Sequence, residues 1–190
     1  MNILWDFDGT LFDTYPVFAK ILKQVTNKDI SEDDLYAQLK ISFSHAIRYF
    51  KIPNSQIKTF ISHVNQLPTE DFKPFKGVEE ILKYANKNVI MTHSTRKEVL
   101  KILQYYDWEK YFAEIVTGDS GFPRKPNPTS YKYLHKKHSI DLVIGDRSLD
   151  IIPAKEIGIK TCLFQNGELG SDYYLEAYED FFSIIKVKSK

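Results

Sequence analysis

Residues 3–10 read ILWDFDGT, an apolar run that ends in two aspartates, a glycine and a threonine. An apolar run this short is typical of a strand buried inside a parallel sheet. Because side chains alternate along a strand, we expect Asp6 and Asp8 to point to the same side. Two neighbouring carboxylates repel each other unless a cation or a shared proton intervenes, and Gly9 leaves room for a sharp turn. The stretch therefore predicts a strand whose carboxyl end carries a ligand site.

Other short apolar runs follow along the chain, at residues 88–92, 114–117, 142–144 and 160–164. Segments with the periodicity of a helix lie between most of them. Strands that alternate with helices predict a parallel sheet covered by helices on both faces. We therefore expect an α/β fold with a Rossmann-like, parallel five-stranded sheet.

The long interval between the first two predicted strands breaks this alternation. Apolar residues at helical spacing occur there in several segments, at residues 15–25, 35–39, 43–50 and 57–67. A single crossover connection rarely needs three or four helices. We therefore expect a small helical cap, residues 14–75, inserted into an α/β core formed by residues 1–13 and 76–190.

Two more aspartates follow the predicted strand at residues 142–144. Asp146 comes at the carboxyl end of that strand, and Asp150 lies about one helical turn further along. Because parallel strands end at the same edge of a sheet, these carboxylates should gather near Asp6 and Asp8. Several carboxylate oxygens form the hard site that Mg²⁺ prefers, together with waters and phosphate oxygens. The sequence therefore predicts an Mg²⁺ site at this edge.

Hydrogen-bond donors and positive charge are expected at the same edge. Thr92 ends the predicted strand at residues 88–92, so its hydroxyl and neighbouring backbone N–H groups would lie near a helix start, which favours anions. Lys125 lies in a proline-containing loop, where a buried lysine would pair with the aspartates and contact a phosphate. An ordinary helix cap and a surface lysine are the alternatives for these two residues.

The composition is that of a globular chain, with 43% hydrophobic and 27% charged residues among 190. A net charge of +1 excludes the basic excess of a general nucleic-acid binder, and no apolar run reaches the roughly 20 residues of a membrane span. The single cysteine, Cys162, excludes an intrachain disulfide. The first residues lack the basic and long apolar regions of a signal peptide, so a reducing, cytoplasmic location is expected.

The ordered set of these motifs resembles the four motifs of the haloacid dehalogenase-like hydrolase superfamily. The set covers nearly the whole chain and consists of Asp6-x-Asp8-Gly-Thr, Thr92, Lys125-Pro and Gly-Asp146-x-x-x-Asp150. The helical insertion resembles the C1 cap of subfamily I, and the chain is most similar to phosphoglycolate phosphatase-like proteins. Dehalogenase members lack an acid two residues after the first aspartate. The presence of Asp8 therefore favours phosphate chemistry.

The resemblance implies an Mg²⁺-dependent phosphatase that works through an aspartyl-phosphate intermediate. Asp6 would be the nucleophile. Asp8 would protonate the leaving alcohol and then deprotonate the attacking water. The Asp6 carboxylate, the Asp8 carbonyl and Asp146 would hold the magnesium ion.

The same resemblance assigns the remaining motif residues to phosphate binding and support. Thr92 and Lys125 would bind the transferring phosphoryl group, and Asp150 would orient Lys125 or a water molecule. The implied partner is a small phosphorylated metabolite, with no nucleic-acid or membrane partner. The sequence leaves the natural substrate and the oligomeric state open.

Two alternatives stay open beside the phosphatase: a phosphosugar mutase on the same scaffold, and a non-catalytic binding or regulatory module. A dinucleotide-binding oxidoreductase is excluded because no G-x-G-x-x-G follows the first predicted strand. A P-loop NTPase is excluded because the chain lacks G-x-x-x-x-G-K-[ST].

Discrimination between substrates is expected to come from the helical cap. The core motifs would contact only the phosphate, the magnesium ion and the reacting oxygen, which are common to every substrate. A loop over residues 40–45, followed by a helix, is the segment expected to reach the substrate. Ser44, His45 and Arg48 are the candidate specificity residues.

Overall fold

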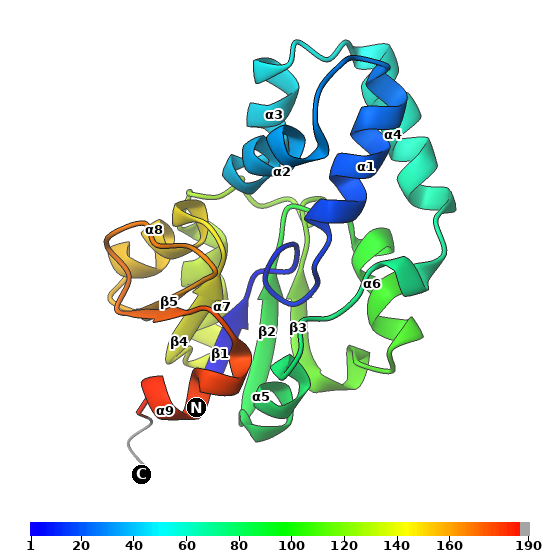
Figure 1. The fold of residues 1–190 in the computed structure, drawn as a ribbon. Helices are drawn as coiled ribbons and strands as arrows, with labels where there is room; N and C mark the ends of the chain where they lie inside the picture. The colour runs from blue at the N-terminus through cyan, green and yellow to red at the C-terminus, as the bar shows by residue number, and fades with distance from the viewer. Residues whose placement is uncertain (187–190) are drawn as a thin grey trace. The chain divides into compact units, whose positions relative to one another are not determined.

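The computed structural model describes residues 1–186, in which six strands form one sheet (Figure 1). Across the sheet the strands follow the order β3-β2-β1-β4-β5-β6, and every neighbouring pair is parallel. Their bounds are β1 Asn2–Trp5, β2 Lys87–Met91, β3 Phe112–Val116, β4 Leu142–Gly145, β5 Lys160–Phe164 and β6 Tyr173–Leu175. Helices flank both faces, so the predicted Rossmann-like α/β class is confirmed.

The described sheet has one strand more than the five expected. The additional strand, β6, pairs with β5 through only three residues at the edge of the sheet. A run of three residues is too short to show the alternation or the apolar length that marks a strand in a sequence. The prediction of five strands is therefore wrong, while each of the five expected strands is present.

The strand β1 occupies the middle of the sheet and is fully buried at Ile3, Leu4 and Trp5. It pairs with β2 on one side and with β4 on the other. The strand order therefore reverses beside β1, and in open α/β sheets ligands bind outside the carboxyl ends of the strands at such a switch point. The residues that directly follow β1 and β4 are Asp6 and Asp146.

The helices of this α/β part alternate with its strands (Figure 1). Their bounds are α5 Val78–Tyr84, α6 Arg96–Tyr105, α7 Thr129–His138, α8 Ser148–Glu156 and α9 Phe181–Ile184, with 3₁₀ turns η2 Glu109–Tyr111 and η3 Tyr178–Asp180. The apolar face of α6, with Val99 and Leu103 fully buried, shows why the periodic segments of the sequence become helices. Burial of these faces stabilises the sheet that positions the site.

The chain divides into two compact units: residues 1–12 together with the chain from residue 74 onward, and residues 13–73. The second unit is helical. It contains α1 Tyr15–Thr26, α2 Glu32–Ile41, α3 Phe43–Tyr49, α4 Asn54–Gln66 and the 3₁₀ turn η1 Thr69–Asp71. Its core includes the ring of Phe60, whose centroid lies 5.8 Å from that of Phe18 and 5.1 Å from that of Phe43. The helical insertion after the first strand is thus present.

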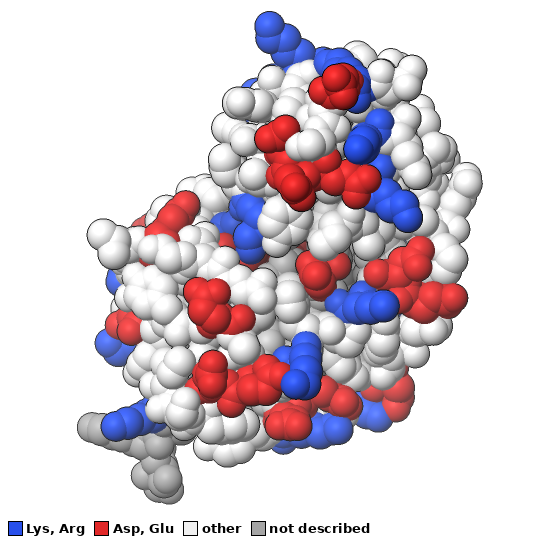
Figure 2. Space-filling model, viewed as in Figure 1, with Lys and Arg blue, Asp and Glu red and all other residues white. Residues whose placement is uncertain are grey.

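Acidic and basic side chains are interspersed over the described residues of the face drawn in Figure 2. Within residues 1–186, no helix combines the length and the apolar character needed to cross a bilayer. The cytoplasmic location stays a prediction. Several charged residues are instead buried at the carboxyl edge of the sheet: Asp6, Lys125, Asp146 and Asp150.

Candidate active site

Asp6 lies at the carboxyl end of the central strand, and only 1% of it is exposed. Its backbone N–H donates to the carbonyl of Ile144 at 2.9 Å, which continues the pairing of β1 with β4 for one more residue. The chain then turns at Gly9, whose φ of +74° lies in the left-handed region that glycine adopts without strain. The local sequence thus fixes Asp6 at the edge of the sheet, and beyond the turn the buried hydroxyl of Thr10 donates to Asp146 Oδ1 at 3.4 Å.

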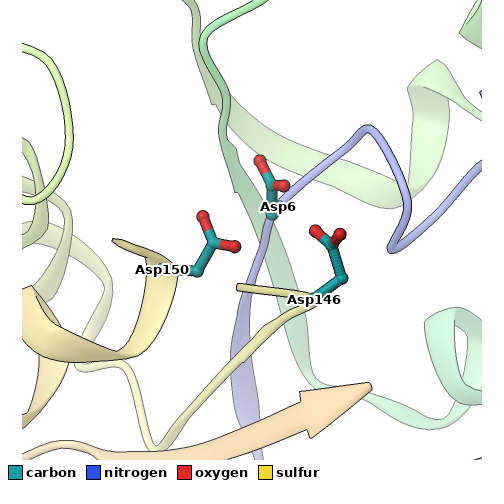
Figure 3. Close-up of side chains that lie close together, drawn as sticks. All are labelled: Asp6, Asp146 and Asp150. Carbon is teal, nitrogen blue, oxygen red and sulfur yellow. The ribbon is translucent and has the colours of Figure 1, made fainter. Parts of the chain in front are cut away.

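Asp146 and Asp150 converge on Asp6 from the neighbouring strand and helix (Figure 3). Among the described residues, these three form a group of carboxylates with one oxygen of each lying within 4.8 Å of the others. Asp146 follows β4, and Asp150 stands in the first turn of α8. A Cβ atom on Gly145 would lie 2.3 Å from the Cβ of Asp150, so only glycine permits this close approach. We call Asp6, Asp146 and Asp150 the carboxylate cluster.

Lys125 provides the cluster with a fully buried positive charge. Its Nζ donates to Asp6 Oδ1 at 2.7 Å, to Asp150 Oδ1 at 2.5 Å and to the carbonyl of Met91 at 3.1 Å. Burial alone would raise the pKa of Asp6, but the charges of Lys125 and then Arg147 outweigh it and hold that pKa below its usual value. Burial would likewise lower the pKa of Lys125, but the two carboxylates raise it. The carboxylate of Asp6 and the ammonium of Lys125 therefore both stay charged at neutral pH.

Arg147 is a member of the site that the sequence motifs did not identify. One guanidinium nitrogen donates to Asp6 Oδ2 at 3.2 Å, and Nε lies 3.6 Å from an oxygen of Asp146 and 3.7 Å from one of Asp150. The side chain is 11% exposed. Its position directly after Asp146 was the available signal, but the sequence does not tell whether a residue there points inward or to solvent.

Asp8 faces a different partner from the cluster. Its carboxylate accepts a hydrogen bond from the hydroxyl of Ser94 at 2.5 Å. Ser94 follows β2, and its backbone N–H donates to the hydroxyl of Thr92 at 3.1 Å. Thr92 is buried at the carboxyl end of the same strand. The structure thus brings Asp8 and Thr92 to the edge that also carries the cluster, and it adds Ser94 between them.

His93 supports Lys125 through the backbone. The N–H of Lys125 donates to Nε2 of His93 at 2.8 Å, so the imidazole holds the loop that carries the lysine. Burial and the positive charges of Lys125, Arg124 and Arg147 lower the pKa of His93 to about 3. The ring is therefore neutral at physiological pH, and a neutral ring nitrogen can accept this hydrogen bond.

The candidate specificity residues lie in the helical unit, on α3. Ser44 and Arg48 are exposed, while His45 is partly buried, with Nε2 2.9 Å from the side-chain oxygen of Gln38. The expected loop over residues 40–45 is wrong. Instead, α2 ends at Ile41, and Ser42 alone separates it from α3, because its hydroxyl accepts from the N–H of His45 and caps the second helix.

The cluster has the donor set that a magnesium ion requires. Its ligand atoms are carboxylate oxygens, which are the hard donors that Mg²⁺ prefers, and three buried carboxylates so close together need positive charge to remain ionised. Both oxygens are occupied in Asp150 and in Asp6. In Asp150, Oδ1 accepts from the buried Lys125 and Oδ2 from the backbone N–H of Arg147 at 3.1 Å, whereas Oδ2 of Asp6 accepts from the side chain of Arg147 at 3.2 Å. Because a side chain can move more easily than the backbone, Asp146 and Asp6 are the better candidates for metal ligands.

Residues 3–164 match a family model described as haloacid dehalogenase-like hydrolase. A phosphoglycolate phosphatase of Vibrio parahaemolyticus is 24% identical, and the aligned region covers 82% of this chain and 79% of that protein. Pyrophosphatase PpaX of Halalkalibacterium halodurans is also 24% identical, over 100% of this chain and 98% of that protein.

A solved structure of a hydrolase from Streptococcus pneumoniae is 31% identical to the chain. The superposition covers 87% of this chain and 93% of that one, with a TM-score of 0.67. These relatives agree with the resemblance drawn from the four motifs and with the prediction of a hydrolytic enzyme. Since the family model spans most of the sequence, the chain belongs to the haloacid dehalogenase-like hydrolase family.

Proposed function

We propose that the chain is an Mg²⁺-dependent phosphatase that releases inorganic phosphate from a small phosphorylated metabolite. The observation that carries this proposal is the carboxylate of Asp6, ionised and buried beside Lys125 at the carboxyl edge of the sheet. The named relatives support it because both are phosphatases, one of phosphoglycolate and one of pyrophosphate. Their two names differ in the substrate.

The magnesium ion, held by the carboxylates of Asp6 and Asp146 and the carbonyl of Asp8, would neutralise the charge of the phosphoryl group. Asp150 would remain with Lys125, since its Oδ1 is held by that buried ammonium and its Oδ2 by the backbone N–H of Arg147. Lys125, with Thr92, would place donors around the phosphoryl oxygens.

The proposed reaction has two steps on this chain's own residues. An oxygen of Asp6 attacks phosphorus, the bond from phosphorus to the ester oxygen breaks, and the leaving oxygen takes a proton from Asp8. A water molecule then attacks the aspartyl-phosphate, gives its proton to Asp8 and releases inorganic phosphate with the original Asp6 carboxylate. Ser94 would orient Asp8 for both proton transfers, because its hydroxyl donates to that carboxylate.

The helical unit is proposed to select the substrate. The groups at the carboxylate cluster would meet only parts common to all phosphate esters, so discrimination requires residues that meet the rest of the molecule. Ser44, His45 and Arg48 remain the candidates for that role.

The proposal is tested with a panel of phosphorylated metabolites and an aryl phosphate, each assayed with Mg²⁺ and with EDTA. We expect inorganic phosphate to appear only with Mg²⁺. The Asp146→Asn variant should need at least about tenfold more Mg²⁺ for half-maximal activity, because one direct ligand has lost its charge. Conversion of a sugar phosphate into an isomer without phosphate release would instead identify a mutase, and no turnover of any compound would support a binding module.

A further inference from the structure

The starting observation is that both oxygens of Asp6 already have cationic partners. Oδ1 accepts from Lys125 at 2.7 Å, and Oδ2 accepts from the guanidinium of Arg147 at 3.2 Å. Each carboxylate oxygen keeps a second lone pair, so a metal ion could still bind there. A divalent cation on either oxygen would however lie beside the ammonium of Lys125 or the guanidinium of Arg147, and withdrawal of one of the two would relieve that repulsion.

The two cations are held very differently. Lys125 is fully buried and makes three hydrogen bonds of 2.5 to 3.1 Å. Arg147 makes a longer bond to Asp6, and its Nε lies at ion-pair distances of 3.6 and 3.7 Å from the other two carboxylates. Its side chain is also 11% exposed, so it has access to solvent. Arg147 is the partner that can leave at the lower cost.

The backbone around Arg147 allows its side chain to move while the chain stays in place. Arg147 is the residue that precedes α8, with an extended backbone at φ −135° and ψ 155°, and its N–H is fixed by Asp150 at 3.1 Å. A positive charge at a helix N-terminus is disfavoured by the helix dipole. The carboxylates, rather than the helix, therefore keep the guanidinium in its inward position.

We propose that Arg147 is an exchangeable cation of the carboxylate cluster, which neutralises the carboxylates while no divalent cation is bound and withdraws when Mg²⁺ binds. Three carboxylates face the two cationic side chains in this cluster. A divalent cation added to them would leave an excess of positive charge, which favours departure of the guanidinium. The inference rests on the proposed function, because it assumes that Asp6 and Asp146 hold Mg²⁺.

A competing internal cation weakens the measured affinity for the metal. Only the molecules in which Arg147 has withdrawn are ready to bind, so the apparent dissociation constant equals the intrinsic one divided by the withdrawn fraction. Removing the guanidinium should therefore tighten Mg²⁺ binding, whereas removing an ordinary ligand or supporting residue would weaken it. The sign of the change distinguishes an exchangeable cation from a structural one.

The test is titration calorimetry of Mg²⁺ alone into the full chain, in the wild type, in Arg147→Gln and in Arg124→Gln. Arg124 is an exposed arginine whose charge acts on His93, so Arg124→Gln removes one positive charge near the site from a residue outside the cluster. We expect Arg147→Gln to bind Mg²⁺ about tenfold more tightly than the wild type, and Arg124→Gln to stay within about twofold of it.

Affinity that is unchanged or weaker in Arg147→Gln would overturn the inference while leaving the magnesium site of the proposed function intact. An absence of Mg²⁺ binding in every form at millimolar concentration would overturn both. A measurement on the wild type keeps the test independent of the variant's folding. The side-chain ¹⁵Nε signal of Arg147, assigned with Arg147→Lys, should shift over the same Mg²⁺ range as the calorimetric binding. A signal that stays unchanged at saturating Mg²⁺ would contradict the exchange.

Discussion

The carboxylate cluster and the helix α3 of the second unit present their functional candidates in opposite ways. In the cluster, Asp6, Asp146 and Asp150 are at most 1% exposed, and two cations hold them in place. On α3, Ser44 and Arg48 are exposed, and His45 contacts a neighbouring side chain of its own unit. Buried carboxylates require partners of opposite charge at fixed positions. Exposed side chains such as those on α3 can be substituted without that constraint, which suits residues that distinguish one substrate from another.

The comparison predicts the largest effect for the residue at the centre of the cluster. Asp6→Asn should reduce hydrolysis of an aryl phosphate by roughly a thousandfold or more, because an amide is nearly isosteric with the carboxylate but a poor nucleophile. Steady-state kinetics measure the loss, and a melting curve checks that the fold persists. The exposed Asp33→Asn serves as a control that should keep full activity. Activity of Asp6→Asn within tenfold of the wild type would remove Asp6 from the nucleophile's role.

The sequence located the cluster because its acidic residues follow strand ends, and strand ends in a parallel sheet meet at one edge. Asp6 and Asp146 were placed by this reasoning, and Asp150 by its position about one helical turn beyond Asp146. For Lys125, which lies in a loop, the residues alone left a surface lysine as the alternative. It did not identify Arg147, because the direction of a long side chain depends on which carboxylates surround it in three dimensions.

The local geometry of the helical unit was harder to predict than its existence. The periodicity of apolar residues predicted α1, α3 and α4 and left α2 open, because only Leu35 and Leu39 indicated it. The break between α2 and α3 depends on one serine hydroxyl that caps the second helix. A serine before a segment of helical periodicity is a known N-cap signal, and Ser42 provides it. The same signal is also compatible with a longer loop before the helix. The edge strand β6 was missed for a different reason, since three residues carry no readable period.

The second prediction concerns the contribution of the buried Lys125 ion pairs to the free energy of unfolding. Lys125→Met should lower the free energy of unfolding by about 3–5 kcal/mol, because it leaves Asp6 and Asp150 buried without their shared cation. Urea unfolding in EDTA measures the change. Lys132→Met is the matched control, because Lys132 pairs with Glu156 on the surface at 57% exposure, where such a pair contributes little. An equal decrease in the free energy of unfolding in both variants would show that the buried ion pairs of Lys125 stabilise the fold no more than the surface pair of Lys132.

The third prediction uses the pKa of His93, which falls from 6.5 to about 3 in the folded chain. Between these values the unfolded chain carries a proton on His93 that the folded chain does not. The free energy of unfolding should therefore decrease as the pH falls from about 6.5 towards 3, by up to about 1.4 kcal/mol per pH unit from this residue.

The variant His93→Gln should lack this contribution and show a shallower dependence on pH. Its amide oxygen can still accept a hydrogen bond, so its kcat should stay above that of His93→Ala, which cannot hold the N–H of Lys125. Unfolding curves from pH 4 to 7 compare the slopes, with the exposed His63→Gln as the control. Parallel slopes for the wild type and His93→Gln would contradict the lowered pKa.

The smallest effect is expected for the exposed residues of α3. Arg48→Ala should change the ratio of kcat/KM between two phosphorylated metabolites by severalfold, on the scale of about 1 kcal/mol for an exposed charge. Hydrolysis of a small aryl phosphate should remain nearly unchanged, because its leaving group offers this arginine no anionic contact. The exposed Lys58→Ala on α4 removes the same charge from another helix of the unit and controls for a general electrostatic effect. A uniform loss on all three substrates would indicate a packing defect, and an equal change in Lys58→Ala would indicate long-range charge. Only a change in the ratio confined to Arg48→Ala assigns specificity to α3.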